Sequence, residues 1–90
     1  MVSFGALGKE GQMRAIPDED GFEFVIRTND HDPRHVHVFK GDGEARFLIY
    51  EDRPPVLDQN WMSGKDVKAA KKILTANRKA VWEKWGEIHG

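Results

Sequence analysis

The chain has 90 residues, a net charge of −1 and no cysteine. This length has room for one hydrophobic core, so we expect a single domain over residues 1–90 with a shallow site rather than a deep cavity. The absence of cysteine excludes disulfides and cysteine-type zinc fingers, and no apolar run reaches the roughly 20 residues of a membrane span, so we expect a cytoplasmic protein without a membrane partner.

The first twenty residues are glycine-rich and polar, and they end in the sequence PDEDG. Pro17 presets φ for a turn, and Gly21 tolerates the positive φ that tight turns need. We expect residues 1–10 to be flexible and the short segment QMRAI before the turn to form an edge strand.

Three segments after this turn alternate apolar and polar residues: FEFVIRT, HVHVFK and EARFLIY. Such a period of two predicts strands, and the GDG joint suits a short hairpin loop. Pro54 and Pro55 end the third strand, and VLD after them is a further short strand. The pattern therefore predicts an antiparallel meander of three to four strands within residues 21–58. The residues expected on its buried face are Phe22, Phe24, Ile26, Val36, Val38, Ala45, Phe47 and Ile49.

Residues 63–88 carry a helical pattern that begins with Ser63 and Asp66 in capping-box spacing. Apolar residues then recur every three or four positions, which predicts a long C-terminal helix covering the sheet, with a kink or a break into two helices near Thr75–Asn77 where helix propensity is weak. The fold class is therefore α+β. Trp82 and Trp85 are expected to take core and rim positions rather than to form a base-stacking platform, and Trp85 belongs to the apolar face of the helix. The segment 63–90 holds seven Lys/Arg and three Asp/Glu, which suits a solvated face or contact with phosphate or an acidic partner.

The sheet face turned away from this helix is the most informative feature of the sequence. Alternation puts His35 and His37 together on that open face, and the neighbouring strands add Arg27 and Arg46. A solvated sheet face is usually rich in Thr, Lys and Glu, so two histidines between arginines call for an explanation.

One interpretation of this face is a metal site. His35 and His37 lie on the same strand face, and His31, Asp30 or Asp32 can approach from the preceding loop. Neutral imidazoles with a carboxylate suit zinc or another divalent ion. The ligand set expected on this interpretation is His31, His35 and His37.

Two other interpretations remain open. Metal-free acid–base chemistry would use His35 and His37 as proton donor and acceptor, with a nearby arginine on phosphate, and would suit RNA cleavage. A structural or binding role would instead use Asp30 and Asp32 for local hydrogen bonds and Pro33 to stiffen the loop, leaving the histidines to face a partner.

The stretch DHDPRHVHV resembles the Asp-His-x-Pro-x-His-x-His signature of DUF4160, a small bacterial family of unknown function. The likeness continues through the hairpin GDGEARFLIY and the late tryptophans of RKAVWEKWGEIHG, over residues 21–88. Carried over by position, the signature falls on Asp30, His31, Pro33, His35 and His37. Asp32 stands where Asn is frequent, and Arg34 stands where a second Pro is frequent. The resemblance implies a compact α+β protein that works with a second small protein in a toxin–antitoxin-like module.

These observations lead to three functional expectations. The first is a toxin–antitoxin-like role through a surface that binds a cognate small protein or RNA. The binding residues expected for it are Arg27, Asp30, His31, Pro33, Arg34 and Arg46. The second is a metal-independent ribonuclease-like toxin with His35 and His37 as its catalytic pair. The third is a divalent-metal protein. No cofactor other than such an ion is expected, and whether the protein is an enzyme is left open.

Overall fold

The structure, a computed structural model, describes residues 11–90, so the expected flexibility of residues 1–10 lies outside the described residues. The elements in chain order are β1 (Gln12–Glu19), β2 (Phe22–Arg27), β3 (His35–Lys40), β4 (Gly43–Leu48), β5 (Val56–Trp61), α2 (Gly64–Ala76) and α3 (Arg78–His89). The strands form one sheet in the order β1-β2-β3-β4-β5, each antiparallel to the next. The α+β class and the antiparallel meander are thus confirmed, but the predicted count of three to four strands is wrong.

The two outer strands explain the error in the strand count. β1 pairs with β2 through two register shifts, on either side of Ile16, so its side chains do not alternate regularly. β5 is exposed along its whole length, so burial imposes no apolar period on it. The sheet therefore runs from Gln12 to Trp61 rather than over residues 21–58.

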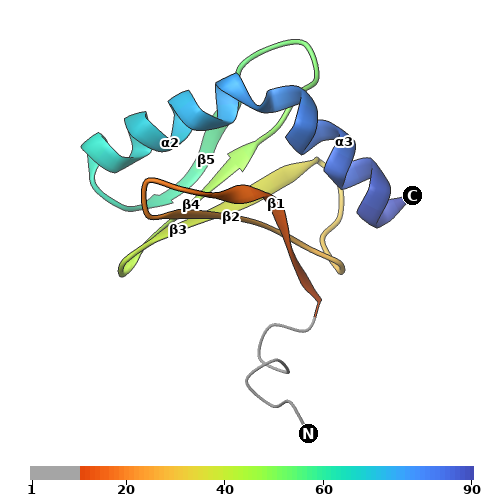
Figure 1. The fold of residues 1–90 in the computed structure, drawn as a ribbon, viewed down its shortest axis with the longest axis horizontal. Helices are drawn as coiled ribbons and strands as arrows, with labels where there is room; N and C mark the ends of the chain where they lie inside the picture. The colour runs from red at the N-terminus through yellow and green to blue at the C-terminus, as the bar shows by residue number, and fades with distance from the viewer. Residues whose placement is uncertain (1–10) are drawn as a thin grey trace, which may run out of the picture.

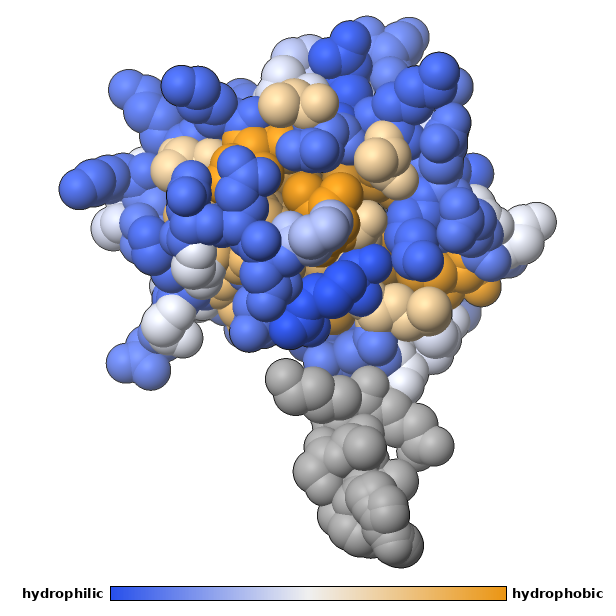
Figure 2. Space-filling view, in the orientation of Figure 1, coloured by the Kyte–Doolittle hydropathy of each residue, from blue (hydrophilic) through white to orange (hydrophobic). Residues whose placement is uncertain are grey.

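Both helices lie on the same side of the sheet (Figure 1). The eight side chains predicted for the buried face all belong to one core cluster, together with Leu74, Val81 and Trp85 from the helices. In the orientation of Figure 1, hydrophobic side chains show only through gaps in a largely hydrophilic surface (Figure 2). No helix within residues 11–90 is both long enough and apolar enough to cross a membrane.

The helical segment begins and breaks where the sequence predicts. The hydroxyl of Ser63 accepts a hydrogen bond of 3.1 Å from the backbone N–H of Asp66, which caps α2. Asn77 separates the helices, and its side-chain Nδ2 donates to the carbonyl of Ile73 at 2.8 Å. Trp85 is buried and Trp82 is half-buried, as expected for core and rim positions.

The β2–β3 loop, residues 28–34, is attached to α3 at the end of the sheet. Arg34 donates to the carbonyl oxygen of Trp82 at 3.1 Å, and its guanidinium lies 3.9 Å from the centre of the Trp82 ring. At the start of the loop, His89 Nε2 lies 3.0 Å from the carbonyl oxygen of Arg27. The loop is therefore held against both the sheet and the last helix.

Candidate functional site

A tight turn directs the carboxylate of Asp30 back toward the sheet. The backbone N–H of Arg27 donates to Asp30 Oδ2 at 2.9 Å, and the N–H of Asp30 donates to the carbonyl of Arg27 at 3.1 Å. The local side-chain hydrogen bond expected of Asp30 is therefore confirmed. With this turn in place, both carboxylate oxygens of Asp30 face the histidines of β3.

The histidines of β3 are buried rather than open to solvent. His35 is 8% exposed and His37 is 6% exposed, so the expectation that they lie on an open sheet face is wrong. The reason is tertiary: the Asp30 turn folds over them, and the Trp85 ring lies 5.3 Å from the His35 ring. The register does place Arg46 directly opposite His37, as predicted.

Asp30, His35 and His37 converge on one point. His35 Nε2 lies 3.3 Å from Asp30 Oδ1, and His37 Nε2 lies 3.3 Å from Asp30 Oδ2. The two imidazole rings are edge to face with centroids 5.0 Å apart. One ligand atom from each residue lies within 4.8 Å of the others, a spacing compatible with ligation of one metal ion.

The other nitrogen of His35 determines what its Nε2 can do. Nδ1 lies 2.8 Å from the carbonyl oxygen of Pro33, and a carbonyl oxygen can only accept, so Nδ1 carries the hydrogen. In a neutral ring Nε2 then carries a lone pair and no hydrogen, and this nitrogen lies 3.3 Å from a carboxylate oxygen of Asp30. Two acceptors repel at this distance, so the pair needs either a second proton on the ring or a cation between them.

The electrostatic surroundings favour the deprotonated forms of two members of the cluster. Burial, assisted by the Arg27 guanidinium, lowers the pKa of His37 below its usual value, and this outweighs the opposite effect of Asp30. Burial alone would raise the pKa of Asp30, but the hydrogen bond from Arg27 and the nearby His35 and His37 lower it overall. Metal ligation requires a neutral imidazole and an ionised carboxylate, so both shifts are in the direction that favours it.

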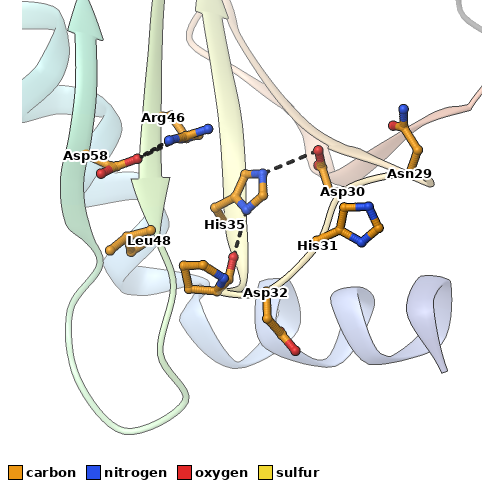
Figure 3. Close-up of a pocket in the computed structure, with 9 residues that line it drawn as sticks. Asn29, Asp30, His31, Asp32, His35, Arg46, Leu48 and Asp58 are labelled. Atoms are coloured by element: carbon orange, nitrogen blue, oxygen red, sulfur yellow. Dashed lines mark hydrogen bonds and ion pairs between the residues drawn. The ribbon is translucent and has the colours of Figure 1, made fainter.

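A pocket of about 420 Å³ opens beside this cluster (Figure 3). Its lining residues are Asn29, Asp30, His31, Asp32, Pro33, His35, Arg46, Leu48 and Asp58. On the wall across from Asp30, Arg46 Nε donates to Asp58 Oδ2 at 2.7 Å, so this guanidinium already has a carboxylate partner. A smaller hollow of about 280 Å³ lies between the loop and α3, and Asp30 lines both spaces.

The remaining residues singled out from the sequence do not join this cluster, although His31, Asp32 and Pro33 line the pocket beside it. His31, Asp32 and Pro33 are exposed on the loop, and within residues 11–90 His31 is not part of the metal-type group. Arg34 points to α3 instead of to the pocket. Arg27 lies close enough to His37 to affect its pKa, and its Nε is buried without a hydrogen-bond partner among the described residues.

Sequence reasoning missed two residues that shape the site. Asp58, which pairs with Arg46, belongs to the exposed strand β5, whose register on β4 has no signature in the sequence. Trp85 was expected in the core, but nothing in the sequence indicated that its ring would cover His35. Asp30 was recognised as a residue that can approach the histidines from the loop, and the spacing DxxxxHxH is the signal for it.

Comparison with known proteins identifies the family. The model of the family described as "Domain of unknown function (DUF4160)" matches residues 21–86, and the chain therefore belongs to that family. No curated protein and no solved structure gives a significant match. The matched span contains Asp30, His35 and His37, so the resemblance read from the sequence is confirmed over the region that forms the site.

Proposed function

We propose that this member of the DUF4160 family binds one divalent transition-metal ion of the zinc type between Asp30, His35 and His37. The observation that carries the proposal is the contact of His35 Nδ1 with the Pro33 carbonyl, because it turns the lone pair of Nε2 toward the Asp30 carboxylate. Metal-binding histidines commonly donate their second N–H to a backbone carbonyl in this way. Two imidazole nitrogens and one carboxylate are also a donor set that zinc favours.

Access from solvent supports a reactive rather than a purely structural ion. Structural zinc sites are closed by four protein ligands, whereas three protein ligands leave a position for water or a substrate oxygen. Asp30 and His35 both line the pocket, so a fourth ligand would come from that side. An ion held there lowers the pKa of bound water to about 7, which is the chemistry of metal-assisted hydrolysis.

The cluster geometry supports metal binding better than the metal-independent ribonuclease. In that mechanism one imidazole accepts a proton while the other donates one to a different atom of the substrate. Here both Nε2 atoms face the same carboxylate, and both histidines are buried. The catalytic pair His35 and His37 stays a prediction, and it requires the Asp30 turn to open.

Titration calorimetry with zinc on chelator-treated, untagged protein tests the metal site. We expect one ion per chain, and we expect Asp30→Asn and His35→Gln to weaken binding by at least about 100-fold, since each removes a ligand. Asp42→Asn is the matched control, because Asp42 is an exposed carboxylate of the β3–β4 hairpin and does not line the pocket. Unchanged affinity in His35→Gln, or an equal loss of affinity in Asp42→Asn, would rule out the proposed ligand set.

A second candidate function is association with a cognate small protein in a cytoplasmic, toxin–antitoxin-like pair. Strand β5 supports it, because Val56 is 48% exposed, Leu57 is 38% exposed and Trp61 is 63% exposed. Within residues 11–90 no strand pairs with the outer edge of β5, and such an edge can accept a strand from another protein.

A small protein encoded by a neighbouring gene, where the genome carries one, is the partner for a co-expression test of the second function. We expect the two proteins to co-purify, and Trp61→Asp to abolish co-purification without loss of the folded state, because Trp61 is outside the core. The matched control is Asn60→Asp, an exposed position on the same strand. Failure of the wild-type pair to associate would remove support for this function.

A further inference from the structure

The solvent side of the two helices carries a run of basic side chains. From Val67 to Trp82 the sequence contains five Lys/Arg and no Asp or Glu. Together with one lysine in the first turn of α2, these residues form what we call the basic ridge. Its members are Lys65, Lys68, Lys71, Lys72, Arg78 and Lys79, and all six are exposed.

We propose that the basic ridge binds the sugar–phosphate backbone of a nucleic acid. This surface is separate from the cluster of Asp30, His35 and His37 and does not depend on the metal site. RNA and DNA present the same phosphate chemistry to lysine, so the proposal concerns that backbone rather than a base sequence.

Helix geometry arranges the ridge as one stripe. Ala70, Ile73 and Leu74 are buried against the sheet, which leaves the opposite side of α2 to the lysines. Lys65, Lys68 and Lys72 are three and four residues apart, so they lie above one another on one helix face.

The stripe continues from one helix to the next. α3 follows α2 along the same side of the sheet (Figure 1), and Arg78 and Lys79 stand in its first turn, directly after the break at Asn77. Within α2 alone, the helical rise from Lys65 to Lys72 amounts to roughly 10 Å, and the basic residues of α3 extend the ridge beyond it. This length suits a chain of phosphates better than a single phosphate group.

The ridge cations have no carboxylate partners, in contrast to several other cations of the protein. Arg14, Lys40, Arg46 and Lys84 each form an ion pair. Among residues 11–90 no ridge side chain forms one within 4.0 Å. Like charges three and four residues apart disfavour a helix, so the ridge carries repulsion that a bound polyanion would relieve.

The aromatic side chains beside the ridge indicate contact with phosphates rather than with bases. Trp85 is in the core, and the face of Trp82 is occupied by the Arg34 guanidinium at 3.9 Å. Base stacking would need an open aromatic face. Lysine is a flexible point charge that contacts phosphate without reading sequence, so we expect sequence-independent, salt-dependent binding.

Fluorescence anisotropy tests the proposal on the full chain with two probes, a labelled oligouridine RNA and a labelled DNA duplex of mixed sequence. Affinity is measured from about 50 to about 200 mM salt, where binding through phosphates weakens steeply. The test variant is Lys68→Gln/Lys72→Gln, and the matched control is Arg14→Gln/Arg53→Gln, which changes the net charge equally outside the ridge. Circular dichroism verifies that each variant is folded.

We expect wild-type protein and the control to bind at low salt, and the ridge variant to bind at least about tenfold more weakly. For single-stranded RNA the slope of log K against log salt should become shallower by about 1.4, because each lost contact removes about 0.7. Binding to RNA alone or to DNA alone would identify the form recognised. Absence of binding to both probes, an unchanged ridge variant, or an equal loss in the control would each overturn the proposal.

Discussion

His35 Nδ1 lies 2.8 Å from the carbonyl oxygen of Pro33, so the nitrogen that is free in a neutral His35 ring is Nε2. Pro33 is only two residues before His35, and β3 begins at His35 itself. The contact is therefore local, whereas the Asp30 carboxylate that Nε2 faces is positioned by a turn on β2. The short segment from Asp30 to His35 therefore contains both the carboxylate that faces Nε2 and the carbonyl that orients the His35 ring.

Stability should depend on pH through His37. Burial and Arg27 lower its pKa in the folded state, so below the unfolded value of 6.5 the unfolded chain binds more protons. The contribution of neutral His37 is fully present above pH 6.5 and is lost as pH falls toward the lowered folded pKa. In urea unfolding with a chelator present, we expect a lower free energy of unfolding at pH 5 than at pH 7.5, and a smaller difference in His37→Gln.

Asp30 should act in a lower pH window. Its folded pKa is below 3.8, so its contribution is present above pH 3.8 and is lost as pH falls through the folded value. Asp30→Asn should therefore flatten the pH dependence below 4 without removing that between 5 and 7.5. An identical pH profile in wild type and both variants would contradict this account of the cluster.

Arg34 should stabilise the folded protein by holding the β2–β3 loop against α3. Arg34→Ala loses the hydrogen bond to the Trp82 carbonyl and the stacking on its ring, for which we expect a loss of about 1–2 kcal/mol in the free energy of unfolding. Arg34→Lys should recover only part of it, because an ammonium lacks the planar guanidinium.

The control for Arg34 is Arg53→Ala, which removes an exposed guanidinium stacked on Tyr50. We expect its effect to stay within about 0.5 kcal/mol. If Arg34→Ala were equally mild, Arg34 would be free for the binding role first expected from the sequence.

Substitution by alanine should change the stability in opposite directions at Gly43 and Gly64. A Cβ on Gly43 would lie 2.8 Å from the Cβ of Met62, so Gly43→Ala should destabilise by about 1–3 kcal/mol. A Cβ on Gly64 meets nothing within 4 Å, and Gly64 begins α2, so Gly64→Ala should stabilise by about 0.4–1 kcal/mol. Thermal unfolding measures both, and the same sign for the two substitutions would contradict the packing of β4 against Met62.

Local periodicity was sufficient to predict the central sheet and the helices. The alternation in β2, β3 and β4 follows from burial on one face, and all eight predicted core residues are buried. The outer strands were predicted only as the short segments QMRAI and VLD, and both are longer in the structure, because β1 has register shifts and β5 buries none of its side chains. Apolar and polar residues alternate along a strand when one of its faces is buried, so this pattern is absent from a strand that is solvated on both faces.

The site was only partly predictable for a related reason. Alternation correctly places His35 and His37 on the same strand face, but it cannot show that a loop and a helix cover them. That cover depends on contacts such as Arg34 with Trp82, 48 residues apart, and His89 with Arg27, 62 residues apart. For the same reason, the choice of Asp30 rather than His31 as third member of the cluster depends on a turn whose geometry the motif alone does not specify.

Anomalous diffraction at the zinc edge from zinc-soaked crystals is the most direct test of the proposed metal site. The account predicts one strong peak about 2.0–2.2 Å from His35 Nε2, His37 Nε2 and an oxygen of Asp30, with its open side toward the pocket. In crystals of His35→Gln this peak should disappear while any surface zinc remains. A peak only at His31 or at other surface residues, with none between Asp30 and the two buried histidines, would contradict the account.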